Sequence, residues 1–546
     1  MTTRMMNELR LIALAAATMC SLQAQAFTFG DGTLQGSFDS NITLGTGVRT
    51  RSPDASLLVS GATGSGAPGG DLALSAGLGD QGDLNYAKGD AFTTYLKGNH
   101  ELLLKLPDEQ ITFMARANWL RDWSATDVTN IIGADTAAVG QTTGLTPDAA
   151  SDLRFKARLL DFWVSKSFSV GDEQVRVRVG NQVISWGESL FLPGGINSSN
   201  AMDLMRLAQP GTQLKEVYLP APMVSVASGL GHGLNVEGYV QTDWNADYFP
   251  PVGSFWSTSQ ALGKGGLPQN HPSNNGQWGL ALRYQPEGTQ MNLGVYAMNY
   301  HDKAPQLHID PASGNASLDY LENRQLYGLS ANMPLGDWAL GTELSYRPRD
   351  AVSLNPAIDG CASLAGNCWV DSRRWQWHLT GLYSMTPSNA KGALDFLHAD
   401  TATLLAEAVL IRYPGLKQQY GQEIVSSGIY GWGQETNPNA TPMAMGTATS
   451  SGWNFDFSWV YDGTLIPGWQ VQPEVYYFQA LSGRTPNASA LFMSGAKSAN
   501  FVVTFMQNPT NWQVALNYTH FWGGSSVFDQ PLRDRDFVGV YVQRNF

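Results

Sequence analysis

Apolar and polar residues alternate along short stretches from one end of the chain to the other. In EQITFMARANWL, residues 109–120, Ile111, Phe113 and Trp119 fall on one face, whereas Arg116 and Asn118 fall on the other. A period of two residues is that of a β-strand with one apolar and one polar face. The pattern recurs in residues 235–244, 279–298, 329–346, 373–383, 452–478 and 499–521. The sequence therefore predicts an all-β protein.

The connections between these stretches are of two kinds. Short turns with Pro, Gly, Asn or Asp occur at residues 106–110, 170–174, 285–289, 334–338, 466–469 and 508–511. Long polar stretches occupy residues 51–89, 125–150, 249–277 and 415–452. Strands of about ten residues joined alternately by short turns and long loops are typical of a transmembrane antiparallel β-barrel of the outer membrane. We predict about 18 strands and accept 14 to 18, because residues 220–228 are ambiguous.

Composition supports a barrel over its soluble alternative, a β-sandwich, in which strands also alternate. Charged residues are only 14% of the chain, whereas the sequence contains 58 Gly, 17 Trp, 20 Tyr and 22 Phe. Few charges and many aromatic residues suit a sheet whose outer face contacts lipid. A sandwich of this length would need several domains joined by visible linkers, and none is apparent. Residues 27–546 are therefore predicted to form one barrel domain.

The first 26 residues have the features of a secretory signal peptide. Arg4 and Arg10 precede an apolar stretch at residues 11–22, and Ala24-Gln25-Ala26 provides a cleavage site before Phe27. The expected location is the outer membrane of a Gram-negative cell. A formal net charge of −13 argues against nucleic acid as a partner.

Cys361 and Cys368 are the cysteines that remain after cleavage, and we predict that they form a disulfide within a loop. A metal site would need further ligands nearby, which the sequence does not offer. The histidines are scattered without a Ser-centred motif beside them, and no glycine-rich phosphate loop precedes a helix. We expect no catalytic residue, metal or cofactor, and no enzymatic activity.

The stretch VRVRVGNQVISWGESLFLPGGIN, residues 175–197, predicts which side chains face the lumen. If Val175, Val177 and Val179 contact lipid, the alternate positions point inward. These predicted lumen residues are Arg176, Arg178, Gln182, Trp186 and Glu188. We expect Glu188 to pair with Arg176 or Arg178. Trp186 has an alternative place in the aromatic girdle at the membrane interface.

On the preceding strand, Arg154, Lys156 and Arg158 share one face. The alternation then shifts phase at Leu159-Leu160, so that Asp161 is also expected to point inward.

Residues 191–220 are too long and too weakly charged for a simple solvated loop. The segment is rich in Pro and Gly, and we predict that it folds into the barrel as a plug or constriction. Its apolar residues are expected to line a path for an apolar ligand, or else to pack the plug against the wall. The candidate residues are Phe191, Ile196, Met202, Leu204 and Met205, with Leu190, Leu192 and Leu207 beside them.

Several motifs resemble those of a proteobacterial outer-membrane family known as domain of unknown function 1302. They include WGES at residues 186–189 followed by PGGIN at 193–197, EGYVQTDW at 237–244, and RDRDFVGVYV at 533–542. The resemblance covers nearly the whole mature chain and implies a barrel rather than a reaction. It also implies hydrophobic cargo, with a periplasmic lipid carrier and an inner-membrane transporter as partners.

The leading hypothesis is therefore an outer-membrane conduit for uptake or export of hydrophobic or lipid-like compounds. Its expected partners are outer-membrane lipids, a hydrophobic small molecule, and the two transport proteins that the resemblance implies. One alternative is a water-filled porin for small polar solutes. Another is a structural or adhesive barrel that acts through its long extracellular loops.

Overall fold

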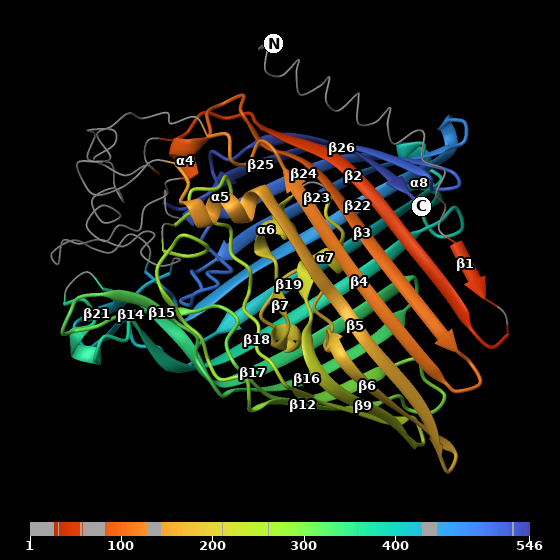
Figure 1. Ribbon diagram of the computed structural model, residues 1–546, viewed down its shortest axis with the longest axis horizontal. Helices are drawn as coiled ribbons and strands as arrows, with labels where there is room; N and C mark the ends of the chain where they lie inside the picture. Colours follow the sequence, from red (N-terminus) through yellow and green to blue (C-terminus); the bar gives the residue numbers. More distant parts are fainter. Residues whose placement is uncertain are drawn as a thin grey trace.

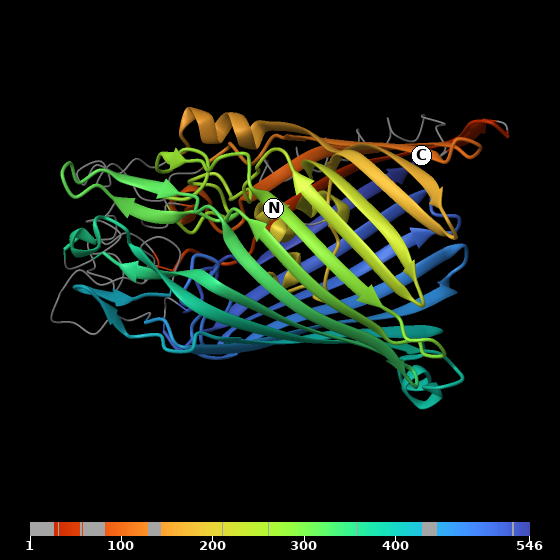
Figure 2. The same ribbon diagram turned by 90° about the horizontal axis from the view of Figure 1, so that it is seen from below.

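Eighteen antiparallel strands form a closed barrel (Figures 1 and 2). The structure is a computed structural model that describes residues 27–30, 32–54, 57, 82–128, 144–209, 211–259, 261–356, 359–427, 445–526 and 529–546. The wall consists of β2 (Gln35–Arg49), β3 (Ala91–Leu106), β4 (Ile111–Asp122), β5 (Phe155–Val170), β6 (Glu173–Gln182), β9 (Ala221–Gly231), β10 (Leu234–Gln241), β12 (Gln277–Tyr284), β13 (Asn292–Tyr300), β16 (Arg324–Leu335), β17 (Trp338–Asn355), β18 (Trp369–Met385), β19 (Thr401–Arg412), β22 (Thr449–Ile466), β23 (Trp469–Ser482), β24 (Ala496–Gln507), β25 (Trp512–Gly523) and β26 (Phe537–Asn545).

The barrel closes between its first and last wall strands. β2 pairs with β26 from Asn41 opposite Asn545 to Arg49 opposite Phe537. Each of the other wall strands pairs with the next one along the chain. The predicted strand number and the antiparallel barrel are therefore confirmed, and the ambiguous residues 220–228 belong to a regular strand, β9.

Short turns and long loops lie at opposite ends of the barrel (Figure 2). The long-loop end carries a small sheet of β11 (Gln269–Asn270), β14 (Gln306–Ile309) and β15 (Ala316–Asp319), with β20 (Gln419–Tyr420) and β21 (Glu423–Val425) nearby. It also carries α4 (Gly82–Asn85) and α5 (Pro147–Arg154), which is capped by the Thr146 side chain. The short-turn end carries β1 (Phe27–Gly30) and α8 (Lys391–Leu397).

The outer face of the wall is apolar. Val295 on β13 is 53% exposed, and its cross-strand neighbours Leu282 and Leu329 are also exposed. Other outward side chains of this kind are Phe162, Val164, Val179, Val226, Val240, Leu280, Tyr327, Trp377, Leu379, Phe501 and Leu516. An apolar outer band on a closed barrel identifies an outer-membrane protein, because lipid solvates such a band and water does not. Among the described residues, no helix is long and apolar enough to cross a membrane.

The inner face is polar and charged. Arg116 on β4 donates to Glu101 of β3 at 2.8 Å and to Asp161 of β5 at 2.6 Å. Asp161 reaches the lumen because the β4–β5 register shifts, with Ala115 opposite Phe162 but Ala117 opposite Leu159. The predicted phase shift at Leu159-Leu160 is therefore confirmed.

Candidate functional site

The connection between β6 and β9, residues 183–220, turns into the barrel instead of extending from it (Figure 1). It contains a 3-10 helix (Ile196–Ser199), β7 (Ala201–Met202), α6 (Leu204–Ala208), α7 (Leu214–Val217) and β8 (Tyr218–Leu219). We call it the lumen segment. It begins eight residues earlier than the predicted plug, because β6 ends at Gln182.

Two buried carboxylates fix the first half of the lumen segment to the wall. Glu343 of β17 accepts hydrogen bonds from the backbone N–H groups of Glu188 at 2.6 Å, Ser189 at 3.2 Å and Ile196 at 2.9 Å. Glu407 of β19 accepts the N–H groups of Phe191 at 2.7 Å and Leu192 at 2.9 Å. Both glutamates are at most 1% exposed. Charge-assisted bonds of this kind in a buried place are strong, so this half of the segment is held tightly.

His378 of β18 lies between the two carboxylates. Its Nδ1 is 2.6 Å from Oε1 of Glu407, and its Nε2 is 2.7 Å from the amide nitrogen of Gln376. That amide also donates to the carbonyl oxygen of Pro193 at 3.0 Å. In this network the imidazole Nε2 accepts and Nδ1 donates, so the ring orients Glu407 towards the segment.

Gly187 of the WGES motif and Gly195 of the PGGIN motif make room for the carboxylate of Glu343. A Cβ on Gly187 would lie 2.2 Å from Oε2 of Glu343, and one on Gly195 would lie 1.8 Å from Oε1 of the same residue. Gly187 and Gly194 also have φ angles of 88° and 97°, which disfavour larger residues. The side chain of Glu343, about 150 residues downstream in the sequence, therefore explains why the motif has glycine at these positions.

A buried ion pair fixes the second half of the lumen segment to another part of the wall. Nζ of Lys97, on β3, lies 2.8 Å from Oε1 of Glu216, and both side chains are 1% exposed. The same ammonium donates to the carbonyl oxygen of Gly211 at 2.6 Å. Arg158 of β5 pairs with Asp203, whose other oxygen caps α6 through the N–H of Arg206 at 2.7 Å. β3 and β17–β19 lie on nearly opposite sides of the strand order, so the segment crosses the lumen.

The predicted lumen residues around this segment do point inward. Indole Nε1 of Trp186 donates to Glu237 at 2.9 Å, and its ring contacts Tyr239 and Tyr296. The guanidinium of Arg178 lies 4.1 Å from the ring centroid of Trp163.

The two other inward residues of β6 have separate surroundings. Gln182 donates to the carbonyl oxygen of Met223 and accepts from Ser225. Arg176 lines a hollow with Glu237 and Arg283.

The predicted pairing of Glu188 with Arg176 or Arg178 is wrong. Its carboxylate accepts a hydrogen bond from Asn332 at 2.8 Å and one from Ser330 at 3.5 Å. The backbone of Glu188 is drawn towards β17 by Glu343, which places the side chain beside β16 and away from β6.

Most of the predicted apolar residues of the segment pack against the protein. Ile196 is fully buried, Leu192 is 5% exposed, and Phe191 contacts the ring of Tyr476. Leu204 and Met205 pack at the edges of two aromatic and aliphatic clusters. Met202 lines a cavity described below. Exposed apolar surface remains at Leu190, Leu207 and Leu214, which are 42%, 52% and 62% exposed.

A loop that the sequence did not single out for this role covers part of the mouth. Within the β10–β12 connection, Phe255 stacks on Phe92 of β3 at 3.9 Å between ring centroids, and Trp256 contacts Phe537 of β26. The Asn85 side chain donates to the carbonyl oxygen of Gly253 at 2.7 Å. This loop thus reaches across from β10 to the β2–β3–β26 side of the rim.

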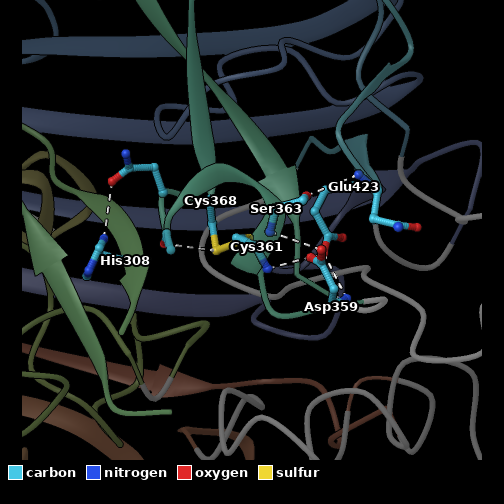
Figure 3. The surroundings of a disulfide bond; sticks show 9 residues. His308, Asp359, Cys361, Ser363, Cys368 and Glu423 are labelled. Carbon is cyan, nitrogen blue, oxygen red and sulfur yellow. Dashed lines mark hydrogen bonds between the residues drawn. A yellow bond between two sulfur atoms is a disulfide. The ribbon is translucent and has the colours of Figure 1, made fainter. Parts of the chain in front are cut away.

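Cys361 and Cys368 form a disulfide in the β17–β18 loop at the long-loop end (Figure 3). Glu423 of β21 accepts the backbone N–H groups of Asp359 at 3.0 Å and Cys361 at 3.2 Å beside it. Burial is the largest cause that raises the pKa of Glu423, to about 7. Among the described residues, no three His, Cys, Asp or Glu side chains are grouped so as to hold a metal ion.

Comparison with solved structures finds matches that cover almost the whole length of both chains. OccAB1 of Acinetobacter baumannii is 12% identical with a TM-score of 0.43, covering 96% of this chain and 99% of that chain. OpdK of Pseudomonas aeruginosa, solved with vanillate, is 11% identical with a TM-score of 0.38, covering 93% and 98%. A BenF-like porin from Pseudomonas fluorescens Pf-5 is 10% identical with a TM-score of 0.41, covering 94% and 98%.

No curated protein matches the sequence. The family model described as "Protein of unknown function (DUF1302)" matches residues 9–546. The chain therefore belongs to the DUF1302 family, as its WGES and PGGIN motifs predicted.

Proposed function

We propose that the protein is an outer-membrane channel for small polar solutes, and that the lumen segment is its constriction. The observation that carries this proposal is the crossing of the lumen by residues 183–220, fixed to β3 at Lys97 and to β17 and β19 at Glu343 and Glu407. A segment that crosses the lumen in this way narrows an 18-stranded barrel, which would otherwise enclose a wide aqueous pore.

The charges on the inner wall support polar rather than apolar cargo. On the side formed by β3 to β12, Arg116 pairs with Glu101 and Asp161 inside the lumen. On the same side, Arg283 lies 3.6 Å from Glu237. On β22 and β23, Asp456 and Glu474 face the lumen, and no cation pairs with them within the described part of the chain. A polar solute that gives up hydrating water here can form hydrogen bonds with these side chains instead, so its dehydration costs little free energy. An apolar solute would displace water from the charged side chains without replacing their hydrogen bonds.

A conduit for hydrophobic compounds is the second candidate. The exposed side chains of Leu190, Leu207 and Leu214 on the lumen segment favour it, because they give an apolar solute a surface inside the barrel. The predicted periplasmic lipid carrier and inner-membrane transporter belong to this candidate. Since each wall strand pairs with both neighbours, a side exit through the wall would require strands to separate.

Single-channel conductance in a planar bilayer tests the constriction. Deleting residues 201–215 removes β7, α6 and the Gly211 contact with Lys97. Because Ala201 lies opposite Leu219, the new junction between Asn200 and Glu216 joins two parts of the chain that are already close together. We expect low conductance from the intact protein and a severalfold higher conductance from the deletion variant. Equal conductance of the two proteins would contradict the proposal.

Adding a long-chain alkane, a sterol or a small polar solute to the same bilayer separates the two candidates. Current block by the polar solute alone supports the polar channel, whereas retention of alkane or sterol on the purified protein supports the conduit. The variant Gly392→Ala serves as a control for effects of expression and purification. Gly392 lies in α8, where the new methyl group has no atom within 4 Å.

A further inference from the structure

A cavity of about 160 Å³ lies between the lumen segment and the long-loop ends of β13, β17 and β18. Its lining includes Tyr300, Arg347 and Arg374 from the wall, Asn200 from the lumen segment, and Asp302 from the loop after β13. One water needs about 15 Å³ by this kind of measure, so the space can hold a small solute. A solute entering from the loop end would meet this cavity before the Glu343 and Glu407 anchors.

Two buried guanidinium groups line the cavity, and each has an N–H group without an acceptor in the part of the chain that the structure describes. Arg347 is 2% exposed and donates to Tyr300 at 2.9 Å and to the carbonyl oxygen of Gly194 at 2.7 Å, but its Nη1 has no acceptor. Arg374 is 4% exposed and donates to Gln376, but its Nε has none. Buried donors without acceptors are costly, so these two point to an absent acceptor.

The charges at the Arg347 and Arg374 end of the cavity also favour an anionic group. Asp350 lies 3.9 Å from Nε of Arg347 and 3.4 Å from Nη1 of Arg374, and thus serves both cations. It already accepts hydrogen bonds from Tyr413 at 2.6 Å and Asn487 at 3.3 Å. At this end of the cavity one carboxylate therefore serves two guanidinium groups, and guanidinium groups match carboxylates in shape.

The opposite part of the lining has a different character. Asp302 pairs with Arg324 at 3.5 Å, and Arg324 also holds Asp371 at 2.6 Å. Asp247 accepts the N–H of Met202 at 2.8 Å, and Lys303 donates to Asn245. Burial raises the pKa of Asp247 to about 6 and that of Asp302 to about 7. These carboxyl groups suit a hydroxyl or amino group of a ligand.

We propose that this cavity binds a small carboxylic acid anion with a second polar group. This proposal rests on the channel function proposed above. The carboxylate of the ligand lies against Arg347 and Arg374, and its hydroxyl or amino group faces Asp247 and Asp302. The site thereby selects solutes before they pass the lumen segment.

Lactate and its neutral analogue lactamide test this assignment, because they differ mainly in the charged group. Binding is measured by equilibrium dialysis with the full-length protein in a detergent that carries no carboxylate. We expect lactate to bind at least about tenfold more tightly than lactamide. Equal affinities of the two probes, or no binding of lactate, would overturn the proposal without any variant.

Arg374→Gln and Arg373→Gln form a matched pair of variants. Arg373 is the next residue on the same strand, but it is exposed and does not line the cavity. We expect Arg374→Gln to weaken lactate binding by about tenfold and Arg373→Gln to leave it unchanged. Equal effects of both changes would overturn the site.

Binding in detergent requires no transport, so the two proposals fail separately. A protein that binds lactate but stays silent in bilayers refutes the channel and keeps the site. A protein that conducts but does not distinguish lactate from lactamide refutes the site and keeps the channel.

Discussion

Gly195 shows how tightly single residues of the lumen segment fit the wall. A methyl group at this position would lie 1.8 Å from Oε1 of Glu343, so Gly195→Ala must move either the segment or the glutamate. We expect the variant to lose the hydrogen bond from Ile196 to Glu343, at a cost of about 1 to 3 kcal/mol, and to conduct more in planar bilayers. The same conductance as the unchanged protein would show that this anchor does not hold the constriction.

Asp302 gives the site a predicted pH dependence. Its folded pKa of about 7 lies above the usual value of 3.8, mainly because the group is buried. The folded state therefore binds the proton more strongly. Stability falls as pH rises from about 4 to 7 and is level above that range. We expect a lower Tm at pH 8 than at pH 5.5, and Asp302→Asn to reduce this difference.

Asp310 provides the control for that measurement. It lies in the loop between β14 and β15, where hydrogen bonds from Ala312 and Ser313 hold its pKa below the usual value. Asp310 is therefore ionised at both pH values, and Asp310→Asn should leave the difference between pH 5.5 and pH 8 unchanged. An unaltered pH dependence in Asp302→Asn would assign the effect to other groups, such as Asp247.

At the scale of residues, sequence predicts the face of a strand better than it predicts a partner. Alternation places Arg176 and Arg178 inward, because a strand has a fixed period of two. It could not predict that Glu188 binds Asn332, because that contact joins residues 144 positions apart and depends on how the lumen segment folds. The roles of Glu343 and Glu407 were missed for the same reason.

The disulfide element of the β17–β18 loop was predictable from the Cys361 and Cys368 spacing in an exported chain. Its closed loop is short, so the entropy model gives a stabilisation of about 2 kcal/mol. We expect a double change of both cysteines to serine to speed proteolysis of the long-loop end and to leave the barrel resistant. Digestion of an equal extent before and after the change would contradict a stabilising role.

Among the elements, strands were predicted well and the lumen segment was predicted only in outline. Gly and Pro between Leu192 and Pro220 indicated a special connection, but its start was placed eight residues late. The reason is that Val183, Ile184 and Trp186 are as apolar as the strand residues before them, so the sequence does not show that β6 ends at Gln182. The sequence did not predict that Phe255 and Trp256 lie across part of the barrel mouth. These aromatic residues belong to a loop, and a loop has no alternating pattern from which their contacts could be inferred.

At the scale of the whole molecule, the apolar outer band makes a direct prediction. Val295→Arg places a charge among exposed apolar side chains on β13, and we expect a loss of about 2 to 4 kcal/mol of folding free energy in lipid. Asn235→Arg faces the lumen hollow beside Glu237 and should cost much less. Unfolding by denaturant in lipid vesicles compares the two, and equal losses would contradict the membrane placement of the band.

The contacts of the lumen segment also bear on how the barrel is assembled after export. The β2–β26 seam joins residues about 500 positions apart, whereas Lys97–Glu216 spans 119 positions and the contact of Glu188 with Glu343 spans 155. Contacts of shorter span cost less chain entropy to form. We therefore expect the contacts of the lumen segment with β3 and β17 to form before β2 pairs with β26. Substitution of Lys97, Glu216 or Glu343 should then slow assembly of the barrel as well as alter the passage of solutes.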